Sequence, residues 1–338
     1  MAGPGRSCPI DYRYQPDDLA GPATFTTPTL YIVGGLYGNT HALDAVLARA
    51  ASEPVRPEIV FNGDFHYLDT DPDRFAAIEA GVHAHHATLG NVEYALTSTD
   101  DTVGCGCDYP AYVADDVVTN SNLVLDQLRD TAPLTDAGRA RLAALPRHLT
   151  VDVGGHRVGI VHGDPESLAG WRLALEALDP PDERARTETG FDGETTSSET
   201  VVDWCLRADV TALCCTHTGL PHAQDHNESD DRGGRRHLVV NNGCAGLPNY
   251  AGQRFGVMTR LSADPHPPAD SLYGITLDGL RFDAIPVRYD HDRWHDDFLR
   301  AWPPGSPGHI NYAARIDAGP WLTVEHSARG RVSPSPVG

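Results

Sequence analysis

The chain contains no lysine, so all 26 of its basic side chains are arginines. This absence excludes enzymes that form a Schiff base through a lysine, and it excludes P-loops, whose lysine reaches the phosphates of a nucleotide. The basic side chains are outnumbered by 47 acidic ones, which gives a formal net charge of -21. A surface of that charge repels polyanions, so we expect neither nucleic acid nor an anionic membrane among the partners.

Long apolar runs are also absent. No stretch approaches the ~18 uninterrupted apolar residues typical of a membrane span, and Met1–Pro22 lacks the basic stretch and apolar run of a secretory signal. The seven cysteines are odd in number, and their close pairs, Cys105/Cys107 and Cys214/Cys215, do not have the spacing of a secreted disulfide framework. These absences predict a soluble, cytoplasmic protein with reduced thiols.

The apolar pattern predicts an α/β fold. A strand over Thr29–Gly34 is followed by apolar residues at helical spacing over His41–Ala51 and by a second strand over Glu58–Phe61. Later strands are separated by turn residues, which implies a second sheet. Further helices are expected over Pro72–Leu89, Ser121–Leu128 and Thr135–Leu145, and further strands over Leu149–Val153, Arg157–Val161, Asp209–Cys215, His237–Asn241, Gly256–Leu261, Tyr273–Leu277 and Arg281–Val287.

We expect three parts along the chain: an N-terminal extension over residues 1–28, a main domain over residues 29–288, and a C-terminal tail over residues 289–338. Within the main domain, residues 178–198 are rich in Pro, Asp, Glu and Thr and contain few apolar side chains. That composition favours a mobile, lid-like excursion from the core.

The C-terminal tail is rich in aromatic side chains. Trp294, Phe298, Trp302 and Tyr312 are too many for a disordered segment, because large rings gain stability by being buried. The tail is therefore expected to pack on the main domain, with a frayed end from Glu325 onward.

Four polar side chains come just after short apolar runs, where turns in the backbone can direct them into one crevice. Asp64 follows Phe-Asn-Gly, Asn91 follows Thr-Leu-Gly, His162 follows Gly-Ile-Val, and His217 follows Leu-Cys-Cys-Thr. Ligands of open α/β sheets bind at the carboxyl ends of the strands, so these four side chains can converge. One carboxylate, one amide and two imidazoles suit zinc, manganese or ferrous iron better than calcium. Taken singly, each residue could equally cap a turn or form a buried hydrogen bond.

The motifs that contain these residues resemble those of the calcineurin-like metallophosphoesterase family, over roughly residues 29–261. The resemblance implies a four-layer α/β/β/α sandwich of two mixed sheets flanked by helices, with two metal ions that share a bridging aspartate. It implies that Asp64 is the bridge and that Asn91, His162 and His217 are the other ligands of the second ion. The matching motifs are Gly63-Asp64, Gly90-Asn91, His162-Gly163-Asp164 and Thr216-His217-Thr218, with a Gly38-Asn39 turn after the first strand.

The chain departs from the family pattern at the first metal ion. Where the family has Asp-x-His after the first strand, this chain has Gly35-Leu36-Tyr37, and where the family has His-x-His, it has His217-Thr218-Gly219. All three missing ligands belong to the first ion, so the resemblance implies a site for one divalent transition metal ion, Mn, Fe or Zn. The family's histidine after Asn91, often assigned as a general acid, is Val92 here.

Catalytic side chains are expected beside the reduced site. Tyr37 lies at the position of a missing ligand and His66 lies two residues after Asp64, so either could bind a phosphoryl group or donate a proton. A packed aromatic and a surface histidine are the alternatives. Asp164 could orient His162, since metal-binding histidines commonly donate their other N–H to a carboxylate, or it could cap a turn.

An anionic substrate requires arginine in a chain without lysine. We expect Arg254 and Asn39 to contact the substrate, because a guanidinium binds phosphate bidentately; an ordinary surface position is the alternative for Arg254. Cys105-Gly106-Cys107 lacks the second cysteine pair of a soft-metal site, which favours a loop shaped by glycine.

The sequence thus predicts a metal-dependent phosphoesterase, either a phosphatase or a phosphodiesterase, for a small anionic phosphorylated metabolite. Two alternatives follow from the missing ligands. One is a non-hydrolytic protein that binds a metal ion and a ligand. The other is a single-metal enzyme of altered chemistry, such as a lyase or a hydrolase of a non-phosphate bond.

Overall fold

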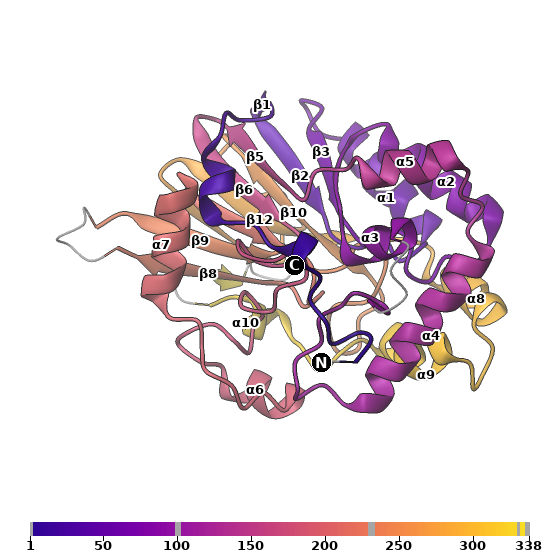
Figure 1. Ribbon diagram of the computed structural model, residues 1–338. Helices are drawn as coiled ribbons and strands as arrows, with labels where there is room; N and C mark the ends of the chain where they lie inside the picture. Colours follow the sequence, from indigo (N-terminus) through magenta and orange to yellow (C-terminus); the bar gives the residue numbers. More distant parts are fainter. Residues whose placement is uncertain (1–2, 99–102, 229–233, 330–331, 335–338) are drawn as a thin grey trace.

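The computed structural model describes residues 3–98, 103–228, 234–329 and 332–334, and these form two mixed β-sheets between layers of helices (Figure 1). The strand order is β13-β11-β12-β10-β2-β3-β4 in one sheet and β1-β5-β6-β7-β9-β8 in the other. The strands are β1 (Thr26–Thr27), β2 (Thr29–Val33), β3 (Glu58–Asn62), β4 (His86–Thr88), β5 (His148–Val153), β6 (His156–Val161), β7 (Ala212–Cys215), β8 (His222–Asn227), β9 (Arg236–Asn241), β10 (Gly256–Ser262), β11 (Tyr273–Leu277), β12 (Leu280–Val287) and β13 (Ser333–Pro334). The helices are η1 (Ile10–Tyr12), η2 (Pro16–Ala20), α1 (Thr40–Ala51), α2 (Pro72–His83), α3 (Asn91–Thr97), α4 (Asp115–Thr131), α5 (Asp136–Ala143), α6 (Glu183–Thr189), α7 (Ser198–Ala208), α8 (His291–Ala301), α9 (Pro307–Ala318) and α10 (Val324–Ser327).

The main core lies between the two sheets. In β2, Leu30 and Ile32 belong to the same buried cluster as side chains of β6 in the other sheet. Tyr31 and Val33 alternate with them and belong to a cluster with α1. Side chains alternate across a strand, so a strand covered on both faces must be apolar at nearly every position. This requirement explains the continuous apolar run that marks β2 in the sequence.

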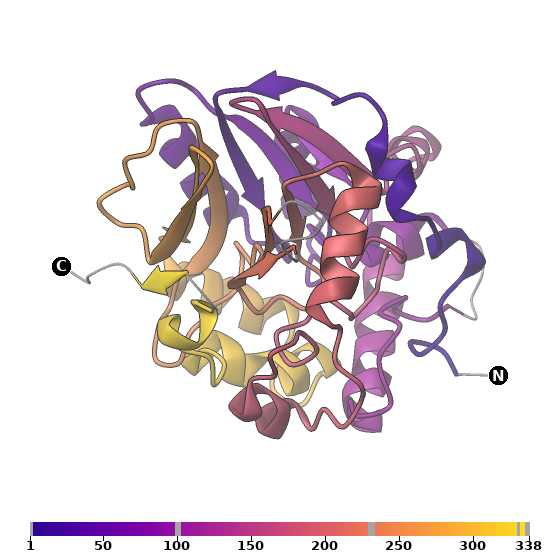
Figure 2. The same ribbon diagram turned by 90° about the vertical axis from the view of Figure 1, so that its left-hand side faces the viewer.

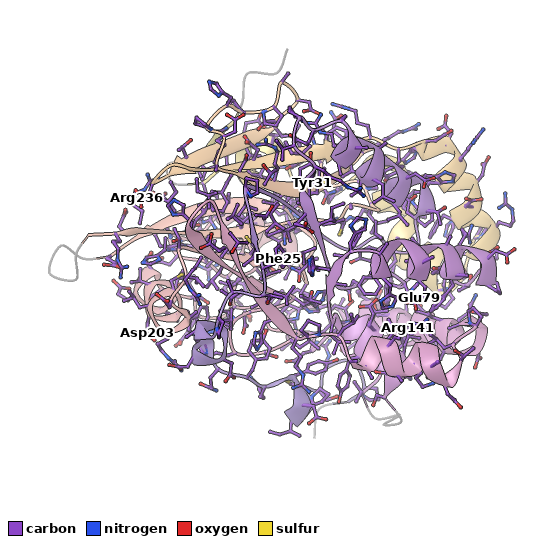
Figure 3. The ribbon with its side chains drawn as sticks, turned by 90° about the horizontal axis from the view of Figure 1, so that it is seen from above. Phe25, Tyr31, Glu79, Arg141, Asp203 and Arg236 are labelled. Atoms are coloured by element: carbon purple, nitrogen blue, oxygen red, sulfur yellow. The ribbon has the colours of Figure 1, made fainter. Side chains whose placement is uncertain are left out.

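Helices cover the outer face of each sheet. Leu43 and Val46 of α1 pack with outward-facing residues of β2, β3 and β10, and Trp204 of α7 packs on the outer face of the other sheet. Figure 2 shows α7 in front of its sheet, and in Figure 3 Glu79 of α2 and Asp203 of α7 lie on opposite sides of the molecule. The layers are therefore helix, sheet, sheet, helix, as predicted. None of the helices in the described chain is long and apolar enough to cross a bilayer.

The C-terminal aromatic residues form a third packed region. Trp294, Phe298 and Trp302 are at most 2% exposed and share a cluster with apolar side chains of α3 and α4. Beyond Glu325, where a frayed end was expected, α10 continues to Ser327, which is fully buried. The strand β8 provides the packing surface, since a bridge joins it to the residue that follows α10. Residues 330–331 and 335–338 lie outside the described chain.

Residues before β2 and within the expected excursion also have defined neighbours. Tyr12 and Leu19 are buried in the cluster that contains α7, and β1 pairs with β5. Residues 178–198 contain α6, and a β-bridge joins Leu178 to Thr196 at the two ends of the excursion.

One predicted helix is too long, and the strand β8 was not predicted. The helix expected over Pro72–Leu89 ends at His83, because the following residues form β4 and pair in parallel with β3. The Thr88 hydroxyl then donates a hydrogen bond to Asn62 Oδ1, 2.7 Å away. The strand β8 was not predicted, because His-Ala-Gln-Asp-His-Asn contains no β-branched or aromatic side chain apart from its imidazoles, and only pairing with β9 places it in the sheet.

Candidate metal centre

Asp64 lies in a tight turn directly after β3. Gly63 and Asp64 both have left-handed backbone, with φ of 77° and 56°. Glycine is required at position 63, because a Cβ there would lie 2.6 Å from both Gly90 Cα and His162 Nδ1. Aspartate is one of the few other residues that tolerate this conformation. The turn therefore holds the Asp64 side chain between the start of α3 and the end of β6.

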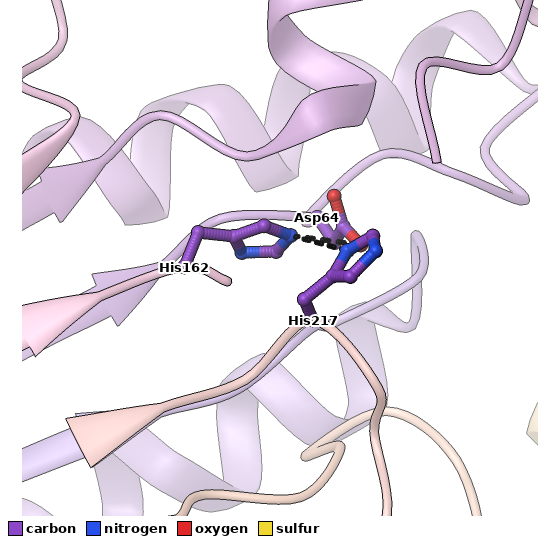
Figure 4. A group of neighbouring side chains, drawn as sticks. All are labelled: Asp64, His162 and His217. Carbon is purple, nitrogen blue, oxygen red and sulfur yellow. Dashed lines mark hydrogen bonds and ion pairs between the residues drawn. The ribbon is translucent and has the colours of Figure 1, made fainter. Parts of the chain in front are cut away.

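His162 and His217 follow the adjacent parallel strands β6 and β7, so they lie at the same edge of the sheet. His162 Nε2 is 3.4 Å from Asp64 Oδ2 and 3.3 Å from His217 Nδ1 (Figure 4). One ligand atom from each of these three side chains lies within 4.8 Å of the others. Asn91, the first residue of α3, places its Oδ1 3.1 Å from His162 Nε2. All four residues singled out in the sequence thus come together.

Each imidazole directs one nitrogen into the site. His162 Nδ1 lies 2.8 Å from the Asn62 carbonyl oxygen, which can only accept, so Nδ1 carries a proton and Nε2 is the nitrogen that faces the Asp64 carboxylate and the Asn91 amide oxygen. His217 Nε2 donates to the Cys107 carbonyl oxygen, 3.0 Å away, so Nδ1 has the lone pair. A proton on His162 Nε2 can be donated to the acceptors around it, and a metal ion that binds both facing nitrogens replaces that proton.

Charge and burial act differently on the three side chains. Burial and the nearby His162 ring lower the pKa of His217 to about 4, so this imidazole is neutral near pH 7. Burial alone would raise the pKa of Asp64, but His162 and His217 lower it below its usual value, so the carboxylate is ionised. Burial alone would lower the pKa of His162, but the Asp64 carboxylate raises it, so a metal ion has to displace the His162 Nε2 proton.

Glu93 supports the Asp64 turn through hydrogen bonds to the backbone. This role of Glu93 was not predicted from the sequence. Its carboxylate accepts hydrogen bonds from the backbone N–H groups of Asp64, Phe65 and Gly90, at 2.8, 3.0 and 3.2 Å. Burial and the neighbouring Asp64 charge raise its pKa to about 7. The signal was present, since a glutamate in the first turn of a helix, three residues after the N-cap Gly90, is typical of a capping box.

A cavity of about 180 Å³ opens onto Asp64, Asn91 and His217. Four tyrosines and one tryptophan contribute to its wall. Trp171 packs edge-on against His217 while donating a hydrogen bond to the Cys107 carbonyl oxygen. The lining residues are Tyr37, Asp64, Tyr67, Asn91, Val92, Cys107, Tyr109, Trp171, His217, Thr218, Tyr312 and Arg315.

Tyr37 lines the cavity, whereas Asn39 does not. Tyr37 has left-handed backbone, with φ of 54°, and its ring forms part of the cavity wall beside Tyr67 and Tyr312. Asn39 is fully buried and caps α1, accepting from Ala42 N and donating to the Gly246 carbonyl oxygen. Its polar atoms are used in the scaffold, which corrects the expectation of a substrate contact.

His66 lies away from the cavity. It is fully buried, its ring stacks on Phe75, and both ring nitrogens are engaged, Nδ1 with Asp69 at 3.1 Å and Nε2 with Glu79 at 3.0 Å. These contacts correct the expectation that His66 is a catalytic residue. His66 is not a surface histidine either, which was the alternative expected for it.

Asp164 and Arg254 also lie outside the cavity wall. The Asp164 carboxylate accepts from the backbone N–H groups of Glu166, Ser167 and Arg172, so it caps a turn and does not receive the His162 N–H. Arg254 is an exposed side chain, and its Nη1 lies 3.4 Å from Asp292 Oδ1. This position corrects the expectation that Arg254 contacts a substrate in the cavity.

Two further cavity residues were missed by the sequence analysis. Cys107, from the Cys105-Gly106-Cys107 loop, lines the cavity while its carbonyl oxygen holds His217 and Trp171. Arg315 of α9 also lines the cavity, although α9 is far along the chain from every metal-binding residue. The Cys105-Gly106-Cys107 motif was interpreted only as a loop, and no motif indicated Arg315, because both placements depend on how distant segments pack.

Comparison with known proteins gives a likeness in structure but none in sequence. No family model and no curated protein matches the chain. Among solved structures, the hypothetical protein PH1004 from Pyrococcus horikoshii OT3 has a TM-score of 0.55 at 18% identity, covering 87% of this chain and 99% of that one. A metallophosphoesterase from Sphaerobacter thermophilus has a TM-score of 0.49 at 17% identity, covering 86% of this chain and 99% of that one.

These likenesses concern the fold alone, because the identities are low. The chain has two mixed sheets flanked by helices, and the calcineurin-like metallophosphoesterase fold expected from the motifs is confirmed. Three side chains of this fold, Asp64, His162 and His217, form a group that could hold a metal ion.

Proposed function

We propose that the protein is a metal-dependent phosphoesterase that uses one divalent transition metal ion. The observation that carries this proposal is the convergence of His162 Nε2 and His217 Nδ1, which lie 3.3 Å apart beside Asp64 at the cavity. Asn91 is the fourth ligand in the proposal. A bound ion of this kind supplies Lewis-acid polarisation of a phosphoryl oxygen and of a water molecule.

The other residues of the site position these ligands and exclude water. Glu93 fixes the backbone on both sides of Asp64, and the Cys107 carbonyl oxygen fixes the tautomer of His217. Burial raises the pKa values of Tyr37 and Tyr312 well above their usual range, so both phenols stay protonated. Neutral hydroxyls in the wall can donate hydrogen bonds to a phosphoryl group, and Tyr37 is our candidate for this role.

The cavity supports a small substrate. Its volume of about 180 Å³ is below the ~300–1,000 Å³ typical of sites for drug-sized ligands. The chain's charge of -21 disfavours polyanionic partners. We therefore propose a small phosphorylated metabolite, bound by its phosphoryl group at the metal side of the cavity.

The direct test combines metal analysis with an activity screen. The purified protein, loaded in turn with Mn, Fe and Zn, is assayed for phosphate release from small phosphomonoesters and phosphodiesters, with and without a chelator. We expect release that the chelator abolishes, and about one ion per chain by mass spectrometry of the metal content. Two ions per chain would contradict the single-metal site.

A failed screen would favour a different class of function. If no metal supports phosphate release while a phosphorylated ligand still binds in the cavity, the protein is a non-hydrolytic binder built on this fold. Val92 at the cavity wall is consistent with that outcome, since it cannot donate a proton. Consumption of a ligand without phosphate release would instead indicate a lyase or another altered chemistry.

A further inference from the structure

Arg315 presents an unused pair of N–H groups to the cavity. Its Nε donates to the Pro248 carbonyl oxygen at 3.0 Å, and its Nη2 donates to the Gly219 carbonyl oxygen at 2.8 Å. These two bonds hold the guanidinium plane in place. Within the described residues, Nη1 has no hydrogen-bond acceptor and no carboxylate lies within 4 Å of the guanidinium. In a chain with 47 acidic side chains, a half-buried arginine without an acidic partner is available for an external anion.

The guanidinium lies where a side chain of residue 219 would project. A Cβ added to Gly219 would be 3.7 Å from Arg315 Nη1, 3.8 Å from Tyr37 Oη and 2.7 Å from Cys244 Sγ. Gly219 and Tyr37 are two positions at which the family resemblance expects ligands of a first metal ion. In this structure a fixed positive charge and a phenol hydroxyl adjoin those positions.

The balance of charge around the cavity depends on Arg315. Among the described residues that line the cavity, Asp64 carries the negative charge and Arg315 the positive charge, so the two cancel. A divalent ion on the Asp64 side then leaves an excess of two positive charges. A phosphomonoester carries about -1.5 to -2 at pH 7, whereas a diester carries only one negative charge.

We infer that Arg315 replaces the first metal ion as the second positive group of the site and binds the phosphoryl group of a phosphomonoester through its free Nη1, with the Tyr37 hydroxyl beside it. This inference rests on the proposed function for the metal side of the cavity. Arg315 itself needs no metal ion to be in place, since backbone carbonyl oxygens hold it.

Inorganic phosphate is the probe for the first experiment. Its dissociation constant is measured by calorimetry for the wild-type protein, Arg315→Met and Arg315→Lys, with thermal melting of each variant. The control is Arg293→Met, an exposed arginine of α8 that pairs with Asp290. Loss of a charged hydrogen bond should weaken binding by roughly 10- to 100-fold in Arg315→Met, less in Arg315→Lys, and not in the control. Binding within twofold of wild type by a stably folded Arg315→Met would overturn the inference.

A second experiment uses the wild-type protein, so it does not depend on variant folding. Phenylglyoxal modifies arginines, and the rate at each site is followed by peptide mass spectrometry with and without phosphate. Phosphate should protect Arg315 and leave Arg293 unchanged. Equal rates at Arg315 in both conditions would overturn the inference.

The outcomes separate this inference from the proposed function. Arg315-dependent phosphate binding without hydrolysis of any ester would refute the phosphoesterase and retain the anion site. Hydrolysis with unchanged KM and unchanged phosphate inhibition in Arg315→Met would refute the anion site and retain the phosphoesterase. Arg315→Met should lower kcat/KM for a monoester at least tenfold more than for a diester; equal losses would overturn the assignment to monoesters.

Discussion

Asp64 and His66 follow the same strand, two residues apart, yet their side chains belong to two different polar clusters. The cluster of Asp64, His162 and His217 borders a cavity, and each of its imidazoles directs one nitrogen toward the other. The cluster of His66, Asp69 and Glu79 is sealed, and both nitrogens of its imidazole are bonded to carboxylates. The first arrangement can exchange a proton for a metal ion, and the second is closed by ion pairs of its own.

The difference lies in protonation. Burial alone would lower the pKa of His66, but hydrogen bonds to Asp69 and Glu79 raise it to about 9, so this ring is a cation near pH 7. Burial and His162 lower the pKa of His217 to about 4, so that ring is neutral. The pKa of His162, the other imidazole of the open cluster, is raised by Asp64 against the effect of burial. His66 thus forms ion pairs with two carboxylates, whereas the two histidines of the open cluster share one carboxylate and can bind an external cation in place of the His162 proton.

The largest expected effect comes from removing the carboxylate of the open cluster. Asp64→Asn should bring the metal content close to zero and lower phosphoester hydrolysis by ~100-fold or more, because metal catalysis contributes several kcal/mol. Metal content and phosphate release are measured together, with Asp203→Asn on α7 as the exposed control. Full metal content in Asp64→Asn would show that the cluster is no metal site.

Breaking the sealed cluster should act on stability. His66→Asn cannot reach both carboxylates and removes the buried cation between them, although Glu79 keeps Arg141 at 3.7 Å. The loss of the buried ion pair with Asp69 should cost about 3–5 kcal/mol in the free energy of unfolding. Urea unfolding measures this loss. Metal content per folded chain should stay as in wild type, and a loss of metal at unchanged stability would erase the distinction between the two clusters.

Weakening the support of the open cluster should have an intermediate effect. Glu93→Gln replaces an acceptor of three backbone N–H groups with a side chain that has one acceptor oxygen, so Asp64 is held less firmly. The metal dissociation constant should rise by ~10–100-fold. A competing chelator measures it, with Glu183→Gln on α6 as the control, and an unchanged constant would show that Glu93 serves the fold alone.

A third buried histidine, His222, extends the comparison. Its substitution should have the smallest effect on stability near neutral pH. His222 in β8 is fully buried, donates from Nδ1 to the Leu220 carbonyl oxygen, and has Arg329 and His226 nearby. Burial, and secondly Arg329, lower its pKa from 6.5 to about 3. The unfolded chain thus takes up this proton first as the pH falls.

The stability contributed by His222 is therefore complete above pH 6.5 and is lost as the pH falls toward 3, by about 1.4 kcal/mol per pH unit. His222→Asn keeps a donor near Nδ1 and removes the titration, so its stability should depend less on pH across this range. Urea unfolding of metal-free protein between pH 4 and 7 tests this, with exposed His266→Asn as the control. Parallel curves for wild type and His222→Asn would contradict it.

Much of the candidate centre could be predicted because its residues follow strands. Asp64, His162 and His217 each come directly after an apolar run, and parallel strands end at one edge of a sheet. His66 could not be assigned in this way. Its partner Glu79 lies one α2 turn after Phe75, and only the packing of α2 against the end of β3 decides that both ring nitrogens are bonded.

The sequence by itself determined the layers of the fold and the edge at which Asp64, His162 and His217 meet, because apolar periodicity fixes which strands are buried and where they end. Tertiary structure alone decided which polar groups complete the site. Arg315 reaches the cavity because α9 packs against α4, and Arg254 does not reach it because its loop faces solvent. Such placements depend on contacts between segments far apart in the chain, and no local pattern encodes them.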